Sequence, residues 1–541
     1  MRILVSGREM KALDRRSIEE FGIPSMVLME RAALGVAAEA YRMVTGEEPG
    51  NGSAKSPARK TADGGEGREL LQEAGCSGGR KDCLPVLAVC GFGNNGADGI
   101  AAARILHLWG IPVSILLPGG EGRKSPEFEA QLLTAQKLGI PVDTAEEFIP
   151  GRSSLILDAL FGVGLSRPVT GTFLDLIRFI NEQQAPVLSI DIPSGVSSDT
   201  GAVLGGAVKA DVTVTFGEKK LGQALFPGRE LSGRLVISDI GLVPEEEERR
   251  ALHVRSLEPC DLDRIPKRKK NSNKGTFGKV LVMAGSAGMA GAAFFSALAA
   301  YRCGAGLVKI FTAAENRPVL QQKLPEAIVV SYEAEEAKAD PQRWKELVKE
   351  QTAWADVIVL GPGIGTGAAA EMMVETVLSE AYVPLILDAD AVNLLAKRPK
   401  LKEYLTENMI LTPHMMEMSR FTGTGIGELK MDPVGYAGAL SREYGVTCVL
   451  KDAATVISVR DGSLYVNESG SPAMAKGGSG DVLTGVIAGL IAIGMEEGEA
   501  AAMGVYVHGL AGEAAEKRYG IHSVVAGELA DSLSEVMRHA D

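Results

Sequence analysis

The chain has 541 residues, which is too many for one ordinary core and predicts about two to four domains. Hydrophobic residues make up 45% and charged residues 23%, as is usual for a globular protein, and the formal net charge is −13. This acidic balance argues against a nucleic acid or an anionic membrane as partner, because both need a basic surface. It does not exclude a nucleotide, which backbone N–H groups can hold locally.

The cysteines and the apolar stretches predict a cytoplasmic protein without a membrane segment. None of the six cysteines forms a CxxC pair, so a zinc site is not expected, and so few in a long chain are typical of a reducing compartment. The first residues lack the apolar core of a signal peptide. The longest apolar stretch, residues 482–495, is too short to span a bilayer and predicts a buried helix.

Residues from about 8 to 43 have helical periodicity, whereas residues from about 46 to 82 are rich in Gly, Ser, Lys and Glu and predict a flexible insertion. Short apolar runs then alternate with helical segments. The predicted strands are residues 86–90, 113–117, 155–157, 187–190 and 212–215. Strands separated by helices and bounded by Gly or Pro indicate a parallel sheet covered by helices on both faces.

The charged residues 244–273 predict a linker, and its basic run at 267–270 is interpreted as solvated, with nucleotide contact as the less favoured alternative. A second α/β pattern follows, with predicted strands at 280–285, 357–360, 385–387 and 448–450 and a hairpin turn at Asp461-Gly462. The predicted domains are therefore 1–243 and 274–541.

Three predicted strand ends in the first domain carry polar side chains. The loop GFGNNGADG at 91–99 lies between a strand and a helix, where a doubly wound fold binds anions, although alone it equally fits a tight turn with an Asx cap. Asp158 and Asp191 end two further strands, and either one alone would be interpreted as a helix cap. Together they offer oxygen atoms at one sheet edge, which suits a hard cation better than zinc.

Residues 1 to about 242, outside the insertion, resemble the NAD(P)H-hydrate epimerase family. The matching motifs are the loop at 91–99, DALFGVG from Asp158, IDIPSG around Asp191, TFGEKKLG at 215–222 and Pro227-Gly228. Ala97 replaces a usual glycine and should tighten the loop slightly. The resemblance implies a Rossmann-like three-layer αβα domain in which Asn95, Asp158 and Ser194 hold potassium, and Asp191 contacts the substrate near the reacting carbon as the acid/base group. It also implies that the hydrated dinucleotide contacts Asn94, Asn95, Gly96, Ala97, Asp98, Gly162, Val163, Gly164, Leu165, Ser166, Arg167 and Pro168.

In the second domain, GGSGD at 477–481 immediately precedes the apolar helix that starts near Val482. Its amides would form an anion hole, and Asp481 would act as a base on a hydroxyl held against a phosphate. The alternative is an N-cap aspartate after a flexible loop. The motifs GPGIG at 361–365, DADA at 388–391 and LTPH at 411–414 also follow predicted strands. His414 alone would more often be structural, but the nearby Glu417 favours a site.

Residues from about 274 to the C-terminus resemble the NAD(P)H-hydrate dehydratase family, whose fold is ribokinase-like α/β. The resemblance rests on KGTFGK at 274–279, AGS at 284–286 with Gly291-Ala292, and the four motifs above. Met415-Met416 replaces the usual Pro-Gly, and Asp452 replaces a common glycine, which should weaken phosphate contacts by repulsion. The residues implied for the adenine nucleotide are Lys451, Asp452, Ala453, Ala454, Thr455 and Gly480. Those implied for the substrate are Gly291, Ala292, Gly363, His414 and Asp481.

The two resemblances together imply a cofactor-repair enzyme. The first domain would interconvert the R and S hydrates of NADH and NADPH, and the second would dehydrate the S form with ADP and Mg²⁺, ADP being preferred to ATP because the motifs resemble bacterial ones. We expect a homo-oligomer. One alternative is a ribokinase-class small-molecule kinase, such as a hydroxymethylpyrimidine kinase. A non-catalytic scaffold is disfavoured by Asn95, Asp158, Asp191 and Ser194.

Overall fold

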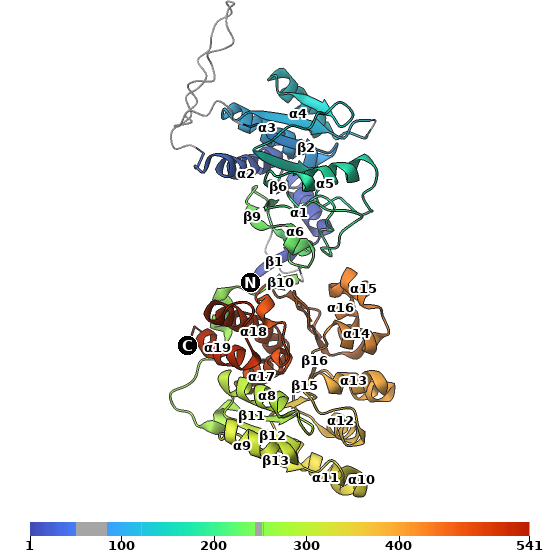
Figure 1. The fold of residues 1–541 in the computed structure, drawn as a ribbon, viewed down its shortest axis with the longest axis vertical. Helices are drawn as coiled ribbons and strands as arrows, with labels where there is room; N and C mark the ends of the chain where they lie inside the picture. The colour runs from blue at the N-terminus through green and yellow to red at the C-terminus, as the bar shows by residue number, and fades with distance from the viewer. Residues whose placement is uncertain (50–83, 121, 244–251, 253, 540–541) are drawn as a thin grey trace, which may run out of the picture. The chain divides into compact units, whose positions relative to one another are not determined.

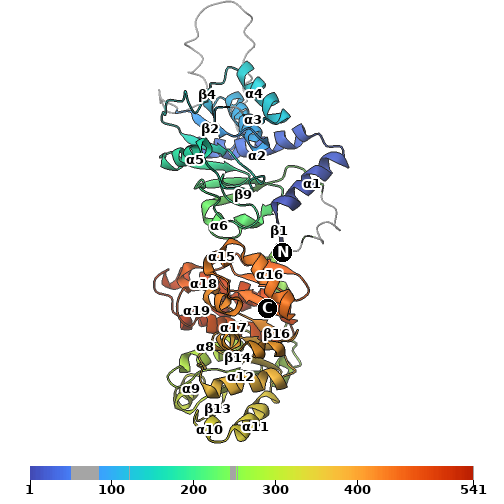
Figure 2. The ribbon, with the colours of Figure 1, turned by 90° about the vertical axis from the view of Figure 1, so that its right-hand side faces the viewer.

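The computed structural model describes residues 1–49, 84–120, 122–243, 252 and 254–539 (Figures 1 and 2). The chain divides into two compact units. One comprises Ile3–Leu252, and the other comprises Met1–Arg2 with His253–Asp541. Both are α/β structures with parallel strands at their centres, so the predicted fold class is confirmed.

The unit Ile3–Leu252 is built on a sheet of order β4-β3-β2-β5-β6-β7-β9, in which every neighbouring pair is parallel. Its strands are β2 (Val86–Cys90), β3 (Val113–Leu117), β4 (Val142–Thr144), β5 (Leu155–Ala159), β6 (Val187–Ile190), β7 (Val212–Phe216) and β9 (Arg234–Ser238). The central strands β2, β5 and β6 are buried at every position. The predicted apolar runs therefore became strands because both of their faces are covered.

Helices cover the two faces of this sheet. Val86, Ala88 and Cys90 pack with α2 (Ser25–Thr45), α3 (Asn94–Leu108) and α4 (Pro126–Lys137). Leu87 and Val89 point to the opposite face and pack with α5 (Thr172–Glu182), because successive strand side chains alternate (Figure 2). This is the predicted three-layer αβα arrangement.

The predicted helical stretch 8–43 forms two helices, α1 (Gly7–Glu19) and α2. Gly22, with φ of 69°, and Pro24, which lacks an N–H group, explain the break between them. Smaller elements complete the unit, namely β1 (Arg2–Val5), which pairs in parallel with β8 (Lys219–Lys220), η1 (Leu221–Gln223) and α6 (Gly228–Leu231). The predicted insertion at 46–82 lies almost entirely outside the described residues.

The second unit has strand order β13-β12-β11-β14-β15-β16-β17-β18-β19-β10. These strands are β10 (Val254–Ser256), β11 (Lys279–Met283), β12 (Leu307–Ala313), β13 (Ile328–Tyr332), β14 (Val357–Leu360), β15 (Leu385–Leu387), β16 (Met409–Leu411), β17 (Thr447–Leu450), β18 (Val456–Ser458) and β19 (Leu464–Val466). Pairing is parallel from β13 to β17 and antiparallel between β17, β18 and β19. Gly462, with φ of 90°, lies in the turn between β18 and β19, so the predicted hairpin is confirmed.

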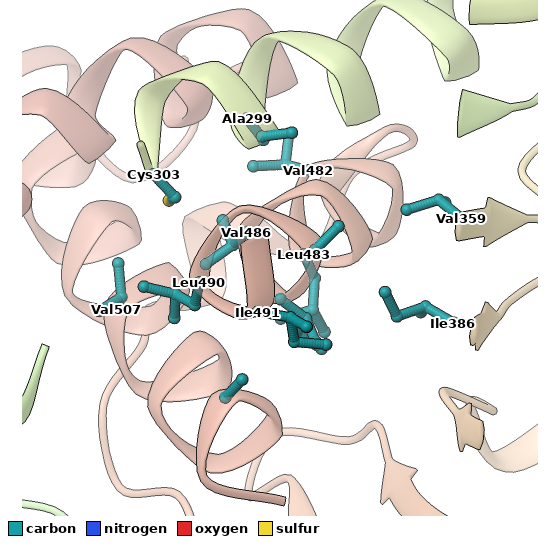
Figure 3. Close-up of a cluster of buried hydrophobic side chains, with 14 of the residues drawn as sticks. Ala299, Cys303, Val359, Ile386, Val482, Leu483, Val486, Leu490, Ile491 and Val507 are labelled. Carbon is teal, nitrogen blue, oxygen red and sulfur yellow. The ribbon is translucent and has the colours of Figure 1, made fainter. Parts of the chain in front are cut away.

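The core of this unit surrounds α17 (Ser479–Ala492), which is buried from Val482 to Ile491 as the apolar stretch predicted. Its side chains pack against Val359 of β14, Ile386 of β15 and Ala299 of α8 (Ala290–Arg302), as Figure 3 shows. An added Cβ on Gly489 would lie 2.8 Å from the Ala300 carbonyl oxygen, so the two helix backbones touch.

Other helices complete the second unit. They are α9 (Arg317–Lys323), α10 (Glu336–Ala339), α11 (Pro341–Thr352), α12 (Ala368–Glu380), α13 (Asp390–Lys397), α14 (Met415–Thr422), α15 (Ile426–Met431), α16 (Pro433–Tyr444), α18 (Glu497–Tyr519) and α19 (Ala526–Arg538). Among the helices that the structure describes, none combines the length and apolar character needed to cross a membrane.

Of the predicted linker 244–273, Leu252 belongs to the first unit and residues 254–273 belong to the second. The latter stretch contains β10 and the 3₁₀ helix η2 (Pro259–Arg264). The amino group of Met1 lies 2.8 Å from Asp261 Oδ2, and the Arg2 guanidinium donates to Glu258 at 2.9 Å. Some of the charged residues that suggested a solvated linker thus form ion pairs that hold the segment against the chain's first two residues. Residues 244–251 and 253 lie outside the described residues.

Candidate active sites

Asp158 and Ser194 lie together at the carboxyl end of the first sheet. Asp158 is the penultimate residue of β5 and is fully buried, and its Oδ2 accepts from the Ser194 backbone N–H at 2.9 Å and the Ser189 hydroxyl at 2.7 Å. The Ser194 hydroxyl accepts from the Phe161 N–H at 2.9 Å. Burial raises the pKa of Asp158, while the hydrogen bonds from Ser194 and Ser189 oppose that rise.

Asn95 and Asp191 flank Gly162 in the same region. A Cβ added to Gly162 would lie 3.1 Å from Asn95 Oδ1 and 3.3 Å from Asp191 Oδ2. The Nδ2 atom of Asn95 is buried and has no hydrogen-bond partner in the part of the chain that the structure describes. Since buried polar atoms are normally satisfied, this amide is available to a ligand.

Gly91 just before α3 and Gly96 in its first turn permit close backbone contacts. An added Cβ on Gly91 would overlap the Leu160 carbonyl oxygen, and one on Gly96 would overlap the Gly91 carbonyl oxygen. Ala97 replaces glycine in the first turn of α3, where its methyl group is fully buried. The loop therefore depends on glycine at positions 91 and 96.

Asp191 is paired with a buried lysine. It directly follows β6 in the left-handed region, with φ of 66°, a conformation that aspartate tolerates better than most residues. Its Oδ1 accepts from Lys220 Nζ at 2.5 Å, and the same ammonium donates to Thr215 Oγ1 at 2.8 Å and the Phe216 carbonyl at 2.9 Å. Lys220 is fully buried, so these three oxygens satisfy its three protons. Lys220 was missed as a site residue; its only signal was the TFGEKKLG motif.

A cavity of about 850 Å³ opens onto these groups. Burial, followed by the charge of Asp191, raises the pKa of Asp98 well above its usual range and also raises the pKa of Asp14 on α1. The predicted residues that line the cavity are Asn94, Asn95, Asp98, Gly162, Val163, Gly164, Leu165, Ser166, Arg167 and Asp191. Gly96, Ala97 and Pro168 do not line it, whereas Asp14, Glu127 and Lys220 were not predicted and do.

In the second unit, three strand ends and one helix start converge. Asp388, just after β15, is 2% exposed, and its Oδ1 accepts from Lys451 Nζ at 2.5 Å and Thr412 Oγ1 at 2.7 Å. A Cβ added to Gly480 would lie 3.5 Å from Lys451 Nζ. The structure thus brings Lys451 and Gly480 together beside a carboxylate. Asp388 belongs to the DADA motif but was not among the predicted site residues.

Asp481 lies in the first turn of α17 next to this network. Burial and the charge of Asp388 raise its pKa to about 7, against the opposing effect of Lys451. Hydroxyl groups of Ser296 and Thr484 donate to the Asp481 carbonyl oxygen at 2.9 and 2.8 Å. These bonds fix the backbone of Asp481, and its carboxyl changes protonation state near neutral pH.

A buried histidine supports the turn that precedes Asp481. His508 Nε2 donates to the Ser479 carbonyl oxygen at 3.0 Å. Burial lowers the pKa of His508 to about 4, so its ring is neutral at pH 7. This bond therefore does not depend on charge at that pH.

His414 begins α14 and forms part of a capping box. Its Nδ1 accepts from the Met416 and Glu417 N–H groups at 3.1 and 3.3 Å, and Glu417 Oε2 accepts from the His414 N–H at 2.9 Å. The Lys451 N–H donates to the neighbouring Pro413 carbonyl at 2.8 Å. His414 is therefore both a helix cap and a neighbour of the Lys451 segment. Of the two unusual methionines, Met415 is buried and Met416 is exposed.

The GPGIG loop, which follows β14, contacts both the Gly291-Ala292 segment and the DADA motif. Gly363 has φ of 62°, and a Cβ there would lie 3.2 Å from the Ala292 side chain on α8. The Gly365 N–H donates to Asp390 Oδ2 at 2.8 Å. Gly291 lies beside Ala292 in the first turn of α8. Three of the five predicted substrate residues, Gly291, Ala292 and Gly363, are thus close together.

The remaining predicted nucleotide residues, Asp452, Ala453, Ala454 and Thr455, form the connection between β17 and β18. Asp452 and Ala453 are exposed, whereas Ala454 and Thr455 are buried. Across the described residues, no group of three or more His, Cys, Asp or Glu side chains is arranged to hold a metal ion.

Comparisons with known proteins cover both units. Residues 25–222 match the family described as YjeF-related protein N-terminus, and residues 280–535 match the NAD(P)H-hydrate dehydratase family. A solved structure, the ADP/ATP-dependent NAD(P)H-hydrate dehydratase from Bacillus subtilis co-crystallised with ATP and Mg²⁺, is 32% identical with a TM-score of 0.45 over 52% of this chain and 98% of that one.

Two curated relatives match almost from end to end. The bifunctional NAD(P)H-hydrate repair enzyme of Moorella thermoacetica is 33% identical over 99% of this chain and 97% of its own length. That of Thermofilum pendens is 34% identical over 98% and 95%. The corresponding enzyme of Escherichia coli is 33% identical over 87% and 89%. The chain belongs to the family of bifunctional NAD(P)H-hydrate repair enzymes.

Proposed function

We propose that the unit Ile3–Leu252 interconverts the R and S hydrates of NADH and NADPH, and that the other unit dehydrates the S hydrate at the expense of ADP. The observation that carries the second activity is Asp481, a carboxyl with a pKa near 7 at the start of a buried helix. A base at that position faces the site where helix N–H groups favour phosphate.

The dehydration divides into two steps. Asp481 takes the proton of the C6 hydroxyl, whose oxygen attacks the β-phosphorus of ADP and releases AMP. The C6–O bond then breaks, phosphate leaves with the bonding electrons, and loss of a proton from C5 forms the C5=C6 double bond of the dihydronicotinamide. The products are NAD(P)H, AMP and phosphate, and the molecule of water that made the hydrate ends up in the phosphate.

Lys451 is the proposed cation for the nucleotide phosphates, since Asp388 pairs with its ammonium group and that group lies close to Gly480. Mg²⁺ would be carried mainly by those phosphates and neutralise their charge, with the carboxylates of Asp388 and Asp390 as its protein ligands. Both carboxylates are close enough for their charge to raise the pKa of Asp481.

In the first unit, Asp191 is the proposed acid/base group. Epimerisation inverts the carbon that bears the hydroxyl, so a group must exchange protons with that oxygen as the C–O bond breaks and re-forms. The Lys220 ammonium pairs with Asp191 at 2.5 Å, while burial favours the protonated form of neighbouring Asp98. Both carboxyl groups face the same cavity, where Asp98 could donate a proton.

Asn95, Asp158 and Ser194 would hold potassium. Asp158 is fully buried and forms no ion pair with any residue that the structure describes. A monovalent cation with oxygen ligands would compensate this single carboxylate. Potassium would offset negative charge beside the bound dinucleotide.

The test of both activities is incubation of mixed R and S hydrates with ADP or ATP, following the return of NADH absorbance. Asp481→Asn should stop dehydration and leave epimerisation unchanged. Accumulation of a phosphorylated product, in place of free phosphate and NADH, would instead indicate a small-molecule kinase. A variant that still dehydrates normally would contradict the role of Asp481.

The potassium site has a separate test. Epimerisation should fall about tenfold in potassium-free buffer and in Asp158→Ala, whereas dehydration of pure S hydrate should not change. Indifference of epimerisation to both changes would leave Asp158 as a helix cap.

We place the enzyme in the cytoplasm and expect a homo-oligomer. Cys90, Cys303 and Cys448 are buried free thiols, and Cys260 is an exposed one, which is consistent with a reducing compartment. Light scattering of the purified chain measures the assembly.

A further inference from the structure

A second cavity, of about 720 Å³, adjoins the first in the unit Ile3–Leu252. The two share Lys11 and the loop residues 163–166. Their charges differ. The first cavity is lined by four acidic and four basic side chains, whereas the second is lined by Arg8, Lys11 and Arg15 of α1 with Asp199 as its one acidic residue.

The three cations form one ridge. Their spacing of three and four residues places them on one face of α1. All three are exposed, and none forms a hydrogen bond or an ion pair with another described residue. Arg16, one position further along, instead donates to Glu20 at 3.0 Å. The ridge therefore presents positive charge to the cavity, and none of its three cations has an ion-pair partner among the described residues.

The ridge has a fixed position relative to the substrate loop. α1 begins at a capping box between Ser6 and Glu9. The Gly7 N–H donates to Asp199 Oδ1 at 2.6 Å, and a Cβ added to Gly7 would lie 3.0 Å from the Val163 carbonyl oxygen. Asp199 is the acidic residue of the cavity lining, and its Oδ1 also accepts from the Ser198 hydroxyl at 3.2 Å. That oxygen is thus occupied in anchoring the helix.

Lys11 links the two cavities. It lines both, and its Nζ lies 3.7 Å from the position that a Cβ on Gly164 would occupy. A dinucleotide whose reacting ring lies beside Asp191 would reach across this loop. Its distal phosphate would then lie at the basic ridge and away from the carboxylates of Asp98 and Asp191.

We propose that this second cavity binds the 2′-phosphate that distinguishes hydrated NADPH from hydrated NADH, an inference that rests on the proposed epimerase function. A phosphate monoester carries a charge of about −1.5 to −2 at pH 7. Arginine forks match its oxygens with paired charge-assisted hydrogen bonds. The pyrophosphate, which both substrates contain, could also bind at the ridge, so the test must distinguish it from the 2′-phosphate.

The test uses the double variant Arg8→Ala/Arg15→Ala in the full chain. Epimerisation of each pure R hydrate is followed by chromatography without ADP, so that dehydration does not consume the product. The KM for hydrated NADPH should rise at least about tenfold, while the KM for hydrated NADH stays unchanged. Retained NADH-hydrate activity also shows that the variant is folded. Arg152→Ala is the matched control, because Arg152 is an exposed arginine of this unit outside both cavities.

A binding measurement keeps this proposal separate from the epimerase assignment. Calorimetric titration with NADP⁺ and NAD⁺, with ADP saturating the other unit, needs no turnover. Selective loss of NADP⁺ affinity in the double variant supports the 2′-phosphate site even if the chain epimerises neither hydrate. Equal losses for both dinucleotides would assign the ridge to the pyrophosphate, and unchanged affinities would show that it binds no phosphate; either result overturns the proposal.

Discussion

Replacing Asp481 with asparagine should abolish dehydration and stabilise the unit that carries the residue. Burial and the charge of Asp388 raise the pKa of Asp481 from 3.8 to about 7. The folded chain therefore holds this proton more tightly than the unfolded chain does. The resulting stabilisation is fully present below pH 3.8 and is lost as the pH rises through about 7.

The magnitude follows from the size of the pKa shift. A rise of about three units corresponds to ~4 kcal/mol once the carboxyl is ionised, at 1.36 kcal/mol per unit. Asparagine has nearly the same shape and does not ionise. The variant should thus exceed the parent in free energy of unfolding by ~4 kcal/mol at pH 8 and by ~2 kcal/mol at pH 5. At about 2 °C per kcal/mol, the unfolding midpoint should rise on the order of 8 °C at pH 8.

Calorimetric scans of the full chain at both pH values measure this difference, with dehydration assayed on the same preparations. Asp263→Asn is the control, because Asp263 is an exposed carboxylate in the same unit. An unchanged midpoint at pH 8 would show that ionised Asp481 carries no desolvation cost. A difference equally large at both pH values would show that the gain comes from packing.

Three other substitutions test the sites. Gly96→Ala should reduce epimerisation at least tenfold while dehydration continues, because its methyl group would overlap a backbone carbonyl; Gly93→Ala, which meets open space, should retain both activities. Lys220→Met should cost about 3–5 kcal/mol in urea denaturation by leaving Asp191 unpaired, and adding Asp191→Asn should recover most of it. His508→Phe should cost ~1–2 kcal/mol in thermal unfolding at pH 8 through its lost hydrogen bond, and about 1 kcal/mol less at pH 6, where the unfolded histidine (pKa 6.5) is largely protonated and the folded one (pKa about 4) is not.

The sheets and the strand-end motifs were predictable because their signals are local. The run 86–90 is apolar at every position since both faces of β2 are covered. Gly91 and Gly96, which follow it, indicate places where two backbone segments come so close that any side chain would overlap a carbonyl oxygen. Parallel pairing then brings Asp158 and Asp191 to one edge without further information.

The partners of those residues were not predictable in the same way. Lys219 and Lys220 are adjacent lysines, and lysine is normally exposed, so nothing local indicates that Lys220 is fully buried against Asp191. Asp14 and Glu127 reach the cavity from α1 and α4, whose positions depend on tertiary packing. Sequence patterns therefore identify site residues at strand ends and miss site residues that lie on helices.

The glycine contacts between α8 and α17 bear on catalysis as well as on packing. The close backbone contact at Gly489 opposes sliding and rotation of the helix that presents Asp481 along its neighbour. The N–H dipoles at the start of this helix are thus preorganised, and they need not rearrange as negative charge develops on the phosphate. Water molecules around the same reaction would have to reorient. A bulkier side chain at Gly489, two turns from the reacting atoms, would consequently lower kcat more than it raises KM.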